Sequence, residues 1–153
     1  MFSKILVPLD GSDHSFKALE AALEIADRFG SEVTLIHVTQ LSLIPIITPE
    51  TPFITSTPIV NPSDFVKLRE VESRVAEEIL DRGESMAREK GICVRKVRRE
   101  GHAVQEIVRE AKEGNYDLIV MGRKGVSGIK ELLLGSVTDG VVRHAPCSVL
   151  VVR

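Results

Sequence analysis

The residues best suited to chemistry in this 153-residue chain lie between positions 122 and 138. Gly122 and Gly125 are separated by two residues, and nine more residues separate Gly125 from a Gly135-Ser136 pair. Glycines let backbone amides approach an anion without obstruction from a Cβ atom. A helix that begins at this pair would turn its first amides and its dipole toward the same anion. The spacing therefore favours a phosphate-binding loop.

Side chains beside these glycines would strengthen the site. A helix beginning at Ser136 leaves the amides of Ser136, Val137 and Thr138 without acceptors in the helix itself. The Ser136 and Thr138 hydroxyls could donate further hydrogen bonds, and Arg123 or Lys124 could supply positive charge. Each part also has a structural explanation, because a glycine can simply end a strand and a serine can simply cap a helix. Phosphate binding is favoured because all the parts occur together.

The elements that must position this motif follow from the hydrophobic pattern, in which short apolar runs alternate with longer stretches of helical periodicity. The pattern predicts strands at residues 5–9, 33–38, 92–97, 117–121 and 148–152. It predicts one helix that follows a Ser12 cap and ends at Phe29, and further helices at 63–90, around 104–111 and at 136–144. The long helix would carry on one face the residues Leu68, Val71, Val75, Ile79 and Met86.

This alternation predicts a single α/β domain over residues 1–153, with a doubly wound, five-stranded parallel sheet and helices on both faces. If the strands lie in the order 3-2-1-4-5, the winding direction reverses between the first and fourth strands. Ligands of such sheets bind at this switch point, beyond the carboxyl ends of the strands. The order would bring Pro8-Leu9-Asp10 beside Met121-Gly122-Arg123. Topology thus predicts a ligand site next to the glycine motif.

Composition argues against several other classes of protein. The formal net charge is −2 and aromatic residues make up 4% of the chain, so nucleic-acid binding lacks both charge and stacking surface. No apolar stretch approaches the roughly 20 residues of a membrane helix, and no signal-peptide core follows Met1. Cys93 and Cys147 show no metal-ligand pattern, and each lies in an apolar run typical of a buried thiol. We therefore expect a cytoplasmic protein that binds neither nucleic acid nor membrane.

The two edge strands of the predicted sheet differ in charge. The third strand carries four cations, Arg95, Lys96, Arg98 and Arg99. Exposed cations discourage an edge from pairing with another chain, so we interpret them as a solvated edge rather than as a phosphate-binding patch. The fifth strand, 148–152, is apolar and has no charged residue before Arg153. A homodimer through this strand is the expected assembly.

One segment departs from the pattern. Residues 41–62 hold five of the seven prolines, and proline at this density prevents regular structure. Because the segment follows the second strand, it would leave the sheet near the predicted site. A lid, a partner contact and a mobile insertion all fit its composition.

The chain lacks residues that other protein classes of similar shape require. A P-loop requires Gly-Lys followed by Ser or Thr, and a dinucleotide fold or an adenylyl transferase requires several glycines after the first strand, where only Gly11 is present. A phosphoacceptor receiver requires an aspartate after the third strand, where the chain reads Arg99-Glu100-Gly101-His102. No catalytic set can be formed by spacing from the four histidines, His14, His37, His102 and His144. No catalytic residue is therefore predicted.

The glycine motif and its surroundings closely resemble those of the universal stress protein family. Gly122-x-x-Gly125 followed by Gly135-Ser136 resembles that family's nucleotide-binding signature. Residues 5–12, 35–38 and 145–152 resemble its first strand and turn, its second strand and its closing strand, so the likeness covers nearly the whole chain. Members with the intact glycine pattern form the ATP-binding branch. The resemblance implies the fold and strand order above and a dimer through the last strand.

The resemblance also implies roles for individual residues. Pro8, Leu9 and Asp10 would line the adenosine side, with Asp10 near the ribose or base. Val38 would offer its backbone to the adenine edge, although an apolar residue at a strand end is equally explained as core. Met121 and Gly122 would flank the ribose, and the phosphates would be held by Gly125, Gly135, Ser136 and Val137. Mg²⁺ would bind through the phosphates and could also contact Asp10, whereas the roles of Arg123 and of 41–62 stay open.

We therefore expect an ATP-binding stress-response protein that acts as a nucleotide-dependent sensor or adaptor for an unidentified protein partner. ADP and AMP are not distinguished from ATP by the residues. Two alternatives remain: a slow Mg²⁺-dependent ATPase, and an interaction scaffold whose nucleotide site is vestigial.

Overall fold

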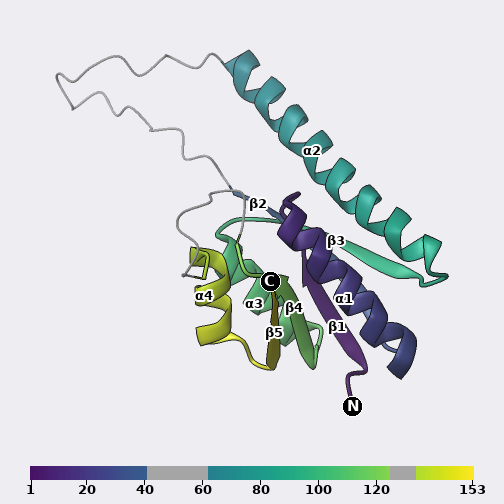
Figure 1. Ribbon diagram of the computed structural model, residues 1–153. Helices are drawn as coiled ribbons and strands as arrows, with labels where there is room; N and C mark the ends of the chain where they lie inside the picture. Colours follow the sequence, from purple (N-terminus) through teal and green to yellow (C-terminus); the bar gives the residue numbers. More distant parts are fainter. Residues whose placement is uncertain (41–61, 125–133) are drawn as a thin grey trace.

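The computed structural model describes residues 1–40, 62–124 and 134–153, and the sheet formed by these residues has five strands (Figure 1). They are β1 (Lys4–Pro8), β2 (Glu32–Thr39), β3 (Val94–Glu100), β4 (Leu118–Gly122) and β5 (Ser148–Val152). Their order is β3-β2-β1-β4-β5, and each pair of neighbours runs parallel. The predicted fold class and strand order are confirmed.

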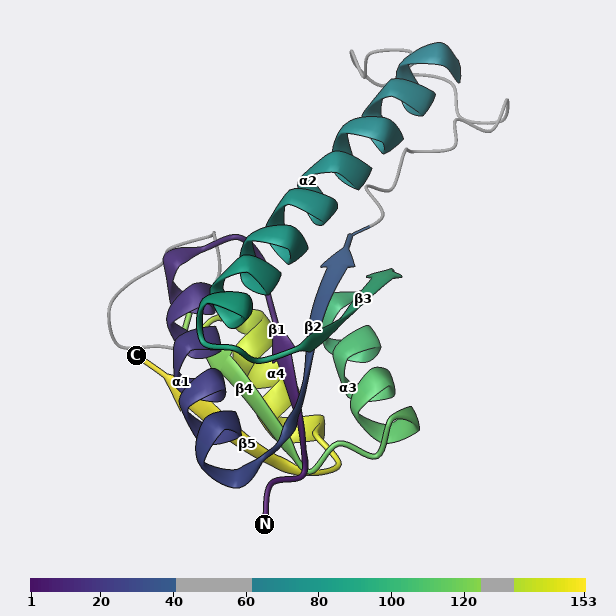
Figure 2. The same ribbon diagram turned by 90° about the vertical axis from the view of Figure 1, so that its right-hand side faces the viewer.

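The sheet is covered on both faces by helices of the described residues, α1 (Asp13–Phe29), α2 (Pro62–Glu89), α3 (Ala103–Glu113) and α4 (Ser136–His144). Two views show α1 and α2 on one face and α3 and α4 on the other (Figures 1 and 2). One apolar cluster joins the sheet to Leu19 of α1 and Leu80 of α2, and a second joins it to Ile107 of α3 and Val141 of α4. Burial on both faces explains why the central strands are almost continuously apolar.

Most element ends lie within one or two residues of their predicted positions, and α4 and β5 have the predicted bounds. Ser12 caps α1, and Gly30 ends it in the left-handed conformation with φ 68°. The start of β3 was predicted two residues too early, at Ile92. The Ile92 amide instead donates a hydrogen bond of 3.0 Å to the Ala87 carbonyl and so closes α2 before the strand begins at Val94.

Two sequence features near the ends of α2 behave differently from prediction. Cys93, expected to be buried, is exposed, because it lies in the connection between α2 and β3 rather than in a strand. The proline-rich segment predicted at 41–62 lies outside the described residues except for Pro62. Pro62 begins α2, a position at which the missing N–H of proline has no partner to lose.

Only the C-terminal half of α2 packs on the sheet. There Gly83 brings the helix so close that a Cβ atom on it would lie 2.8 Å from Leu9 Cδ1. The N-terminal half extends beyond the sheet (Figure 2). Of the predicted apolar face, Ile79 and Met86 pack against the core, whereas the other three side chains are largely exposed, at Leu68 (43%), Val71 (56%) and Val75 (46%). The helical periodicity predicted this helix correctly, but it could not show which part of the helix lies beyond the sheet.

Three of the four cations on the edge strand β3, Arg95, Lys96 and Arg99, pair with acidic side chains of the helices beside it. Lys96 Nζ lies 2.8 Å from carboxylate oxygens of both Asp81 and Glu84 on α2. Arg99 Nη2 lies 2.6 Å from Glu110 Oε2 on α3, and this hydrogen bond raises the pKa of Arg99. These cations are engaged by protein carboxylates, which supports the interpretation of a solvated edge over that of a phosphate-binding patch.

The opposite edge is apolar. β5 ends the strand order and pairs with β4 over Leu118–Gly122. Its central side chain, Leu150, is 39% exposed. The described residues therefore leave the second edge of β5 without a neighbouring strand and without charge.

Candidate functional site

A cavity of about 530 Å³ lies beyond the carboxyl ends of β1, β2 and β4. It occupies the face of the sheet that α3 and α4 cover, because its wall includes Ile36, Ile107 and Met121 of the apolar cluster on that face. The winding of the chain reverses between β1 and β4. The cavity is therefore at the switch point, where topology predicts a ligand site.

Most of the predicted site residues line this cavity, namely Pro8, Leu9, Asp10, Val38, Met121, Gly122, Gly135, Ser136, Val137 and Thr138. Arg123 is not a lining residue. Its main chain instead joins neighbouring segments, since its amide donates to the Val152 carbonyl and its carbonyl accepts from the Gly135 amide, both at 2.9 Å. Gly125 lies outside the described residues. The strand order thus brings the turn after β1 and the glycine motif to one cavity.

Five further lining residues were not predicted: Ser15, Ile36, Gln40, Ala103 and Ile107. Ile36 could have been found, because it lies two residues before Val38 on β2 and side chains at this spacing share a face. Ala103 and Ile107 lie four residues apart on α3 and so share a side of that helix. The sequence alone could not show that α3 begins over the strand ends.

The start of α4 forms the polar end of the cavity. Gly135 is its N-cap, and no side chain accepts a hydrogen bond from the helix there. The Gly135 amide donates to the Arg123 carbonyl, and the first amide used within the helix is that of Asp139, which donates to the Gly135 carbonyl at 2.9 Å. The three amides between them, at Ser136, Val137 and Thr138, are not used by the helix. They carry the positive end of the helix dipole to the cavity.

Thr138 and Gly122 both make contacts that the sequence prediction did not include. The Thr138 hydroxyl was expected to donate to a ligand, but it is buried and donates a hydrogen bond of 2.9 Å to the Gly122 carbonyl. Gly122 was expected to give an anion access to the backbone. Its lack of a side chain has a packing reason as well, because a Cβ atom there would lie 2.6 Å from the carbonyl oxygen of His14 on α1.

Asp10 places a carboxylate on the cavity wall next to β1. Its Oδ1 accepts hydrogen bonds from the Ser12 amide at 2.9 Å and from the Ser12 hydroxyl at 2.6 Å. Ser12 Oγ in turn accepts from the Ser15 amide and so caps α1. The turn thereby fixes the carboxylate group at the end of the strand, at a site where it can accept hydrogen bonds from a hydroxyl-bearing ligand.

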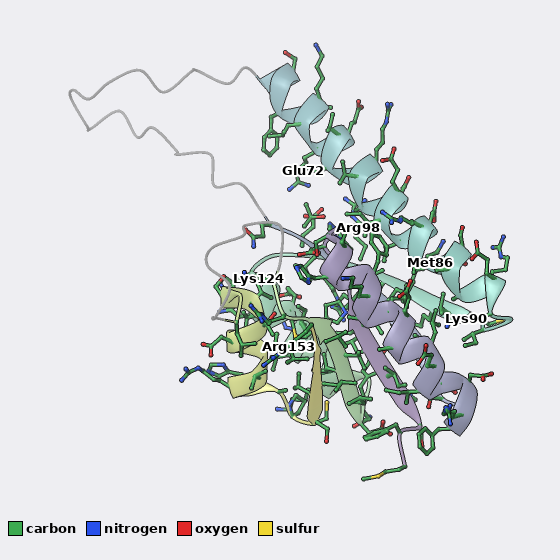
Figure 3. The ribbon with its side chains drawn as sticks, in the orientation of Figure 1. Glu72, Met86, Lys90, Arg98, Lys124 and Arg153 are labelled. Carbon is green, nitrogen blue, oxygen red and sulfur yellow. The ribbon has the colours of Figure 1, made fainter. Side chains whose placement is uncertain are left out.

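Positive charge at the cavity comes from Lys124, which lines it near the start of α4 (Figure 3). Among the described residues, no group of three or more His, Cys, Asp or Glu side chains could hold a metal ion. Of the acidic side chains that the structure describes, Asp10 alone lines the cavity. The same residues include no helix that is both long and apolar enough to cross a membrane.

The histidines lie outside the cavity wall in the described part of the chain. Ring nitrogens of two of them bond to backbone: His37 Nδ1 lies 2.7 Å from the Leu9 carbonyl and His144 Nδ1 lies 2.8 Å from the Gly140 carbonyl. His102 is the N-cap of α3, and its side chain makes no capping hydrogen bond. The described wall therefore offers a carboxylate and a lysine but no imidazole.

Comparison with known proteins agrees with this architecture. A sequence model of the Universal stress protein family matches residues 1–153. The universal stress protein YxiE of Bacillus subtilis (strain 168) is 37% identical over 156 aligned residues, which span all of both chains. The solved structure of universal stress protein UspA from Lactobacillus plantarum is 28% identical with a TM-score of 0.80, covering 99% of this chain and 98% of that one.

Two more distant solved structures share the fold and contain bound nucleotides. A universal stress protein in complex with cAMP aligns with a TM-score of 0.70 at 24% identity over 99% of this chain and 97% of that one. A family protein from Arabidopsis thaliana with AMP bound aligns with a TM-score of 0.66 at 20% identity, over 98% of this chain and 90% of that one. The five-stranded fold and the match over the full length lead to one conclusion: this chain belongs to the universal stress protein family.

Proposed function

We propose that this chain binds an adenine nucleotide, with ATP as the expected ligand, in the cavity at the switch point between β1 and β4. The observation that carries the proposal is the start of α4, where three unused amides face a cavity that also has an apolar wall and a carboxylate. A nucleotide has the matching parts: a flat base, a sugar with hydroxyl groups, and phosphates. The volume of about 530 Å³ lies within the range of ordinary ligand sites, roughly 300–1,000 Å³.

The base would lie against the apolar wall of the cavity. Ile36, Ile107 and Met121 are each nearly fully buried and form this wall together with Val38. Ala103 at the start of α3 adds only a methyl group, which leaves room for a flat ring. In this placement the ribose would lie toward Asp10, whose carboxylate would accept hydrogen bonds from the sugar hydroxyls.

The phosphates would lie at the start of α4. The amides of Ser136, Val137 and Thr138 would donate to them, and Lys124 would add a charge-assisted contact. Gly135 would contribute its lack of a side chain rather than its amide, because that amide already donates to the Arg123 carbonyl. Mg²⁺ would enter with the phosphates, as the donor set of the wall is too small to hold it alone.

Ligands of structural relatives support the chemical class. Universal stress proteins of this fold have been solved with cAMP, with AMP and, from Archaeoglobus fulgidus, with dAMP. All three ligands combine adenine with a phosphate group. At identities of 24%, 20% and 19%, these relatives support the fold alone. Support for nucleotide binding by this chain comes from its own cavity.

We propose that the bound nucleotide acts as a signal rather than as a substrate. Hydrolysis benefits from a positioned general base, and no histidine of the described residues lines the cavity. The nucleotide would then change the surface offered to a protein partner, as in a sensor or adaptor. The proposal includes a homodimer through the open apolar edge of β5 and a cytoplasmic location, the compartment that keeps thiols such as Cys93 and Cys147 reduced.

The proposal is tested by removing one amide from the start of α4. Ser136 is the first helical residue, where proline is tolerated, and the Gly135 conformation of φ −60° and ψ 152° suits a residue before proline. Ser136→Pro removes the amide hydrogen, whereas the control Ser136→Ala removes only the hydroxyl group. In calorimetric titrations with Mg-ATP, we expect the proline variant to bind at least about tenfold more weakly than the alanine variant. Equal affinities in two folded variants would contradict a phosphate site at these amides.

A further inference from the structure

Thr138 joins the two ends of the glycine motif. Its side chain is 3% exposed, and its hydroxyl donates a hydrogen bond of 2.9 Å to the Gly122 carbonyl. A second bond runs in parallel, from the Gly135 amide to the Arg123 carbonyl at 2.9 Å. The last residues of β4 and the first residues of α4 are thus connected by one main-chain and one side-chain hydrogen bond.

We infer that Thr138 is a positioning residue for the phosphate end of the nucleotide. This inference rests on the function proposed above and adds a role that does not involve contact between the Thr138 hydroxyl and the ligand. The hydroxyl hydrogen is committed to the Gly122 carbonyl, so the side chain acts on the ligand through the helix that it holds. The amides of Ser136, Val137 and Thr138 occupy the same helical turn as this hydrogen bond.

The Gly122 carbonyl is a rigid anchor for this bond. Gly122 pairs with Val152 at the end of the β4–β5 ladder, and the next amide, of Arg123, donates to the Val152 carbonyl. On its other side, Gly122 packs so closely on α1 that a Cβ atom would lie 2.6 Å from the His14 carbonyl oxygen. These contacts hold the strand end independently of α4.

The helix itself is short and is held at a second point farther along. α4 has nine residues, and Gly140 brings it against Val104 of α3, where a Cβ atom on the glycine would lie 2.7 Å from Val104 Cγ2. This contact fixes the middle of α4, and the Thr138 bond fixes its beginning. Amide-to-phosphate hydrogen bonds require donor–acceptor distances of about 2.7–3.2 Å, so a small displacement of the first turn weakens them together.

The test separates positioning of the phosphates from general stability. Thr138→Val keeps nearly the same shape but cannot donate, whereas Thr138→Ser keeps the hydroxyl group. Dissociation constants are measured by calorimetry for adenosine, AMP and Mg-ATP. We expect the valine variant to lose about tenfold in affinity for AMP and ATP, to change little for adenosine, and to recover with serine.

A matched control is available at the opposite end of the sheet. Thr34 is also buried, at 4% exposure, but it lies near the start of β2 and does not line the cavity. Thr34→Val removes a buried hydroxyl in the same way. We expect the ratio of ATP affinity to adenosine affinity to stay within about twofold of wild type in this variant.

The possible outcomes distinguish the inference from the proposed function. If wild-type protein binds the ligands and Thr138→Val leaves the ratio of ATP to adenosine affinity unchanged, or weakens both ligands equally, the inference is wrong and the nucleotide site stands. If folded wild-type protein binds neither AMP nor ATP, the proposed function is wrong and the role of Thr138 falls with it. Should the valine variant not fold, Thr138→Ala, in which water can reach the Gly122 carbonyl, is compared in the same way and decided by the same ratio.

Discussion

Gly122 serves the packing of the molecule and the candidate site at once. It lines the cavity, its carbonyl accepts from Thr138, and its missing side chain lets α1 approach the end of β4. From the motif spacing, the predicted reason for this glycine was to give an anion access to the backbone. The contact with α1 depends on residues more than 100 positions away in sequence, such as His14, and so could not be predicted from the motif.

A substitution at Gly122 should therefore reduce stability even without a ligand. In Gly122→Ala, the added methyl group would lie 2.6 Å from the His14 carbonyl oxygen, and backbone would have to move. We expect a loss of about 2 kcal/mol in the free energy of unfolding. Urea denaturation of ligand-free protein measures it, and a midpoint equal to that of wild type would show that Gly122 is needed only for ligand access.

At the scale of the elements, the two edge strands of the sheet, β3 and β5, differ in charge and in the contacts that cover them. β3 is shielded by ion pairs with α2 and α3, whereas β5 has an apolar outer edge in the described structure. A second candidate surface is the projecting half of α2, where Leu68, Val71 and Val75 are exposed. Either surface could bury apolar area in a dimer. One pair of variants shows which of the two surfaces forms the interface.

Leu150→Lys should dissociate the proposed homodimer. It places a charge on the apolar edge strand β5, opposite its own copy across a two-fold axis. Val71→Lys is the matched control, since Val71 is 56% exposed on the part of α2 that extends away from β5 (Figure 1). Sedimentation at micromolar concentration should give a dimer for wild type and Val71→Lys and a monomer for Leu150→Lys. A monomeric wild type, or dissociation only with Val71→Lys, would contradict assembly through β5.

At the scale of the whole molecule, alternation of apolar strands with helical segments predicted the α/β class, and the family resemblance implied the strand order, from which the place of the cavity follows. The order brings Asp10 and Met121 to the same cavity, because it makes β1 and β4 neighbours. The wall contributed by Ala103 and Ile107 was missed, because it depends on how α3 lies across the strand ends. Hydrogen bonds between distant segments, such as those of Thr138 and of the Gly135 amide, leave no periodic signal in the sequence.

We expect this chain, folded and without other components, to bind an adenine nucleotide in this cavity. The most direct measurement is a calorimetric titration of Mg-ATP into protein that has been unfolded, freed of any co-purified ligand and refolded. We expect binding with a dissociation constant on the order of micromolar, a free energy of about −8 kcal/mol. The absence of measurable heat at two temperatures, with circular dichroism showing a folded protein, would contradict the claim and favour a scaffold whose site no longer binds nucleotide.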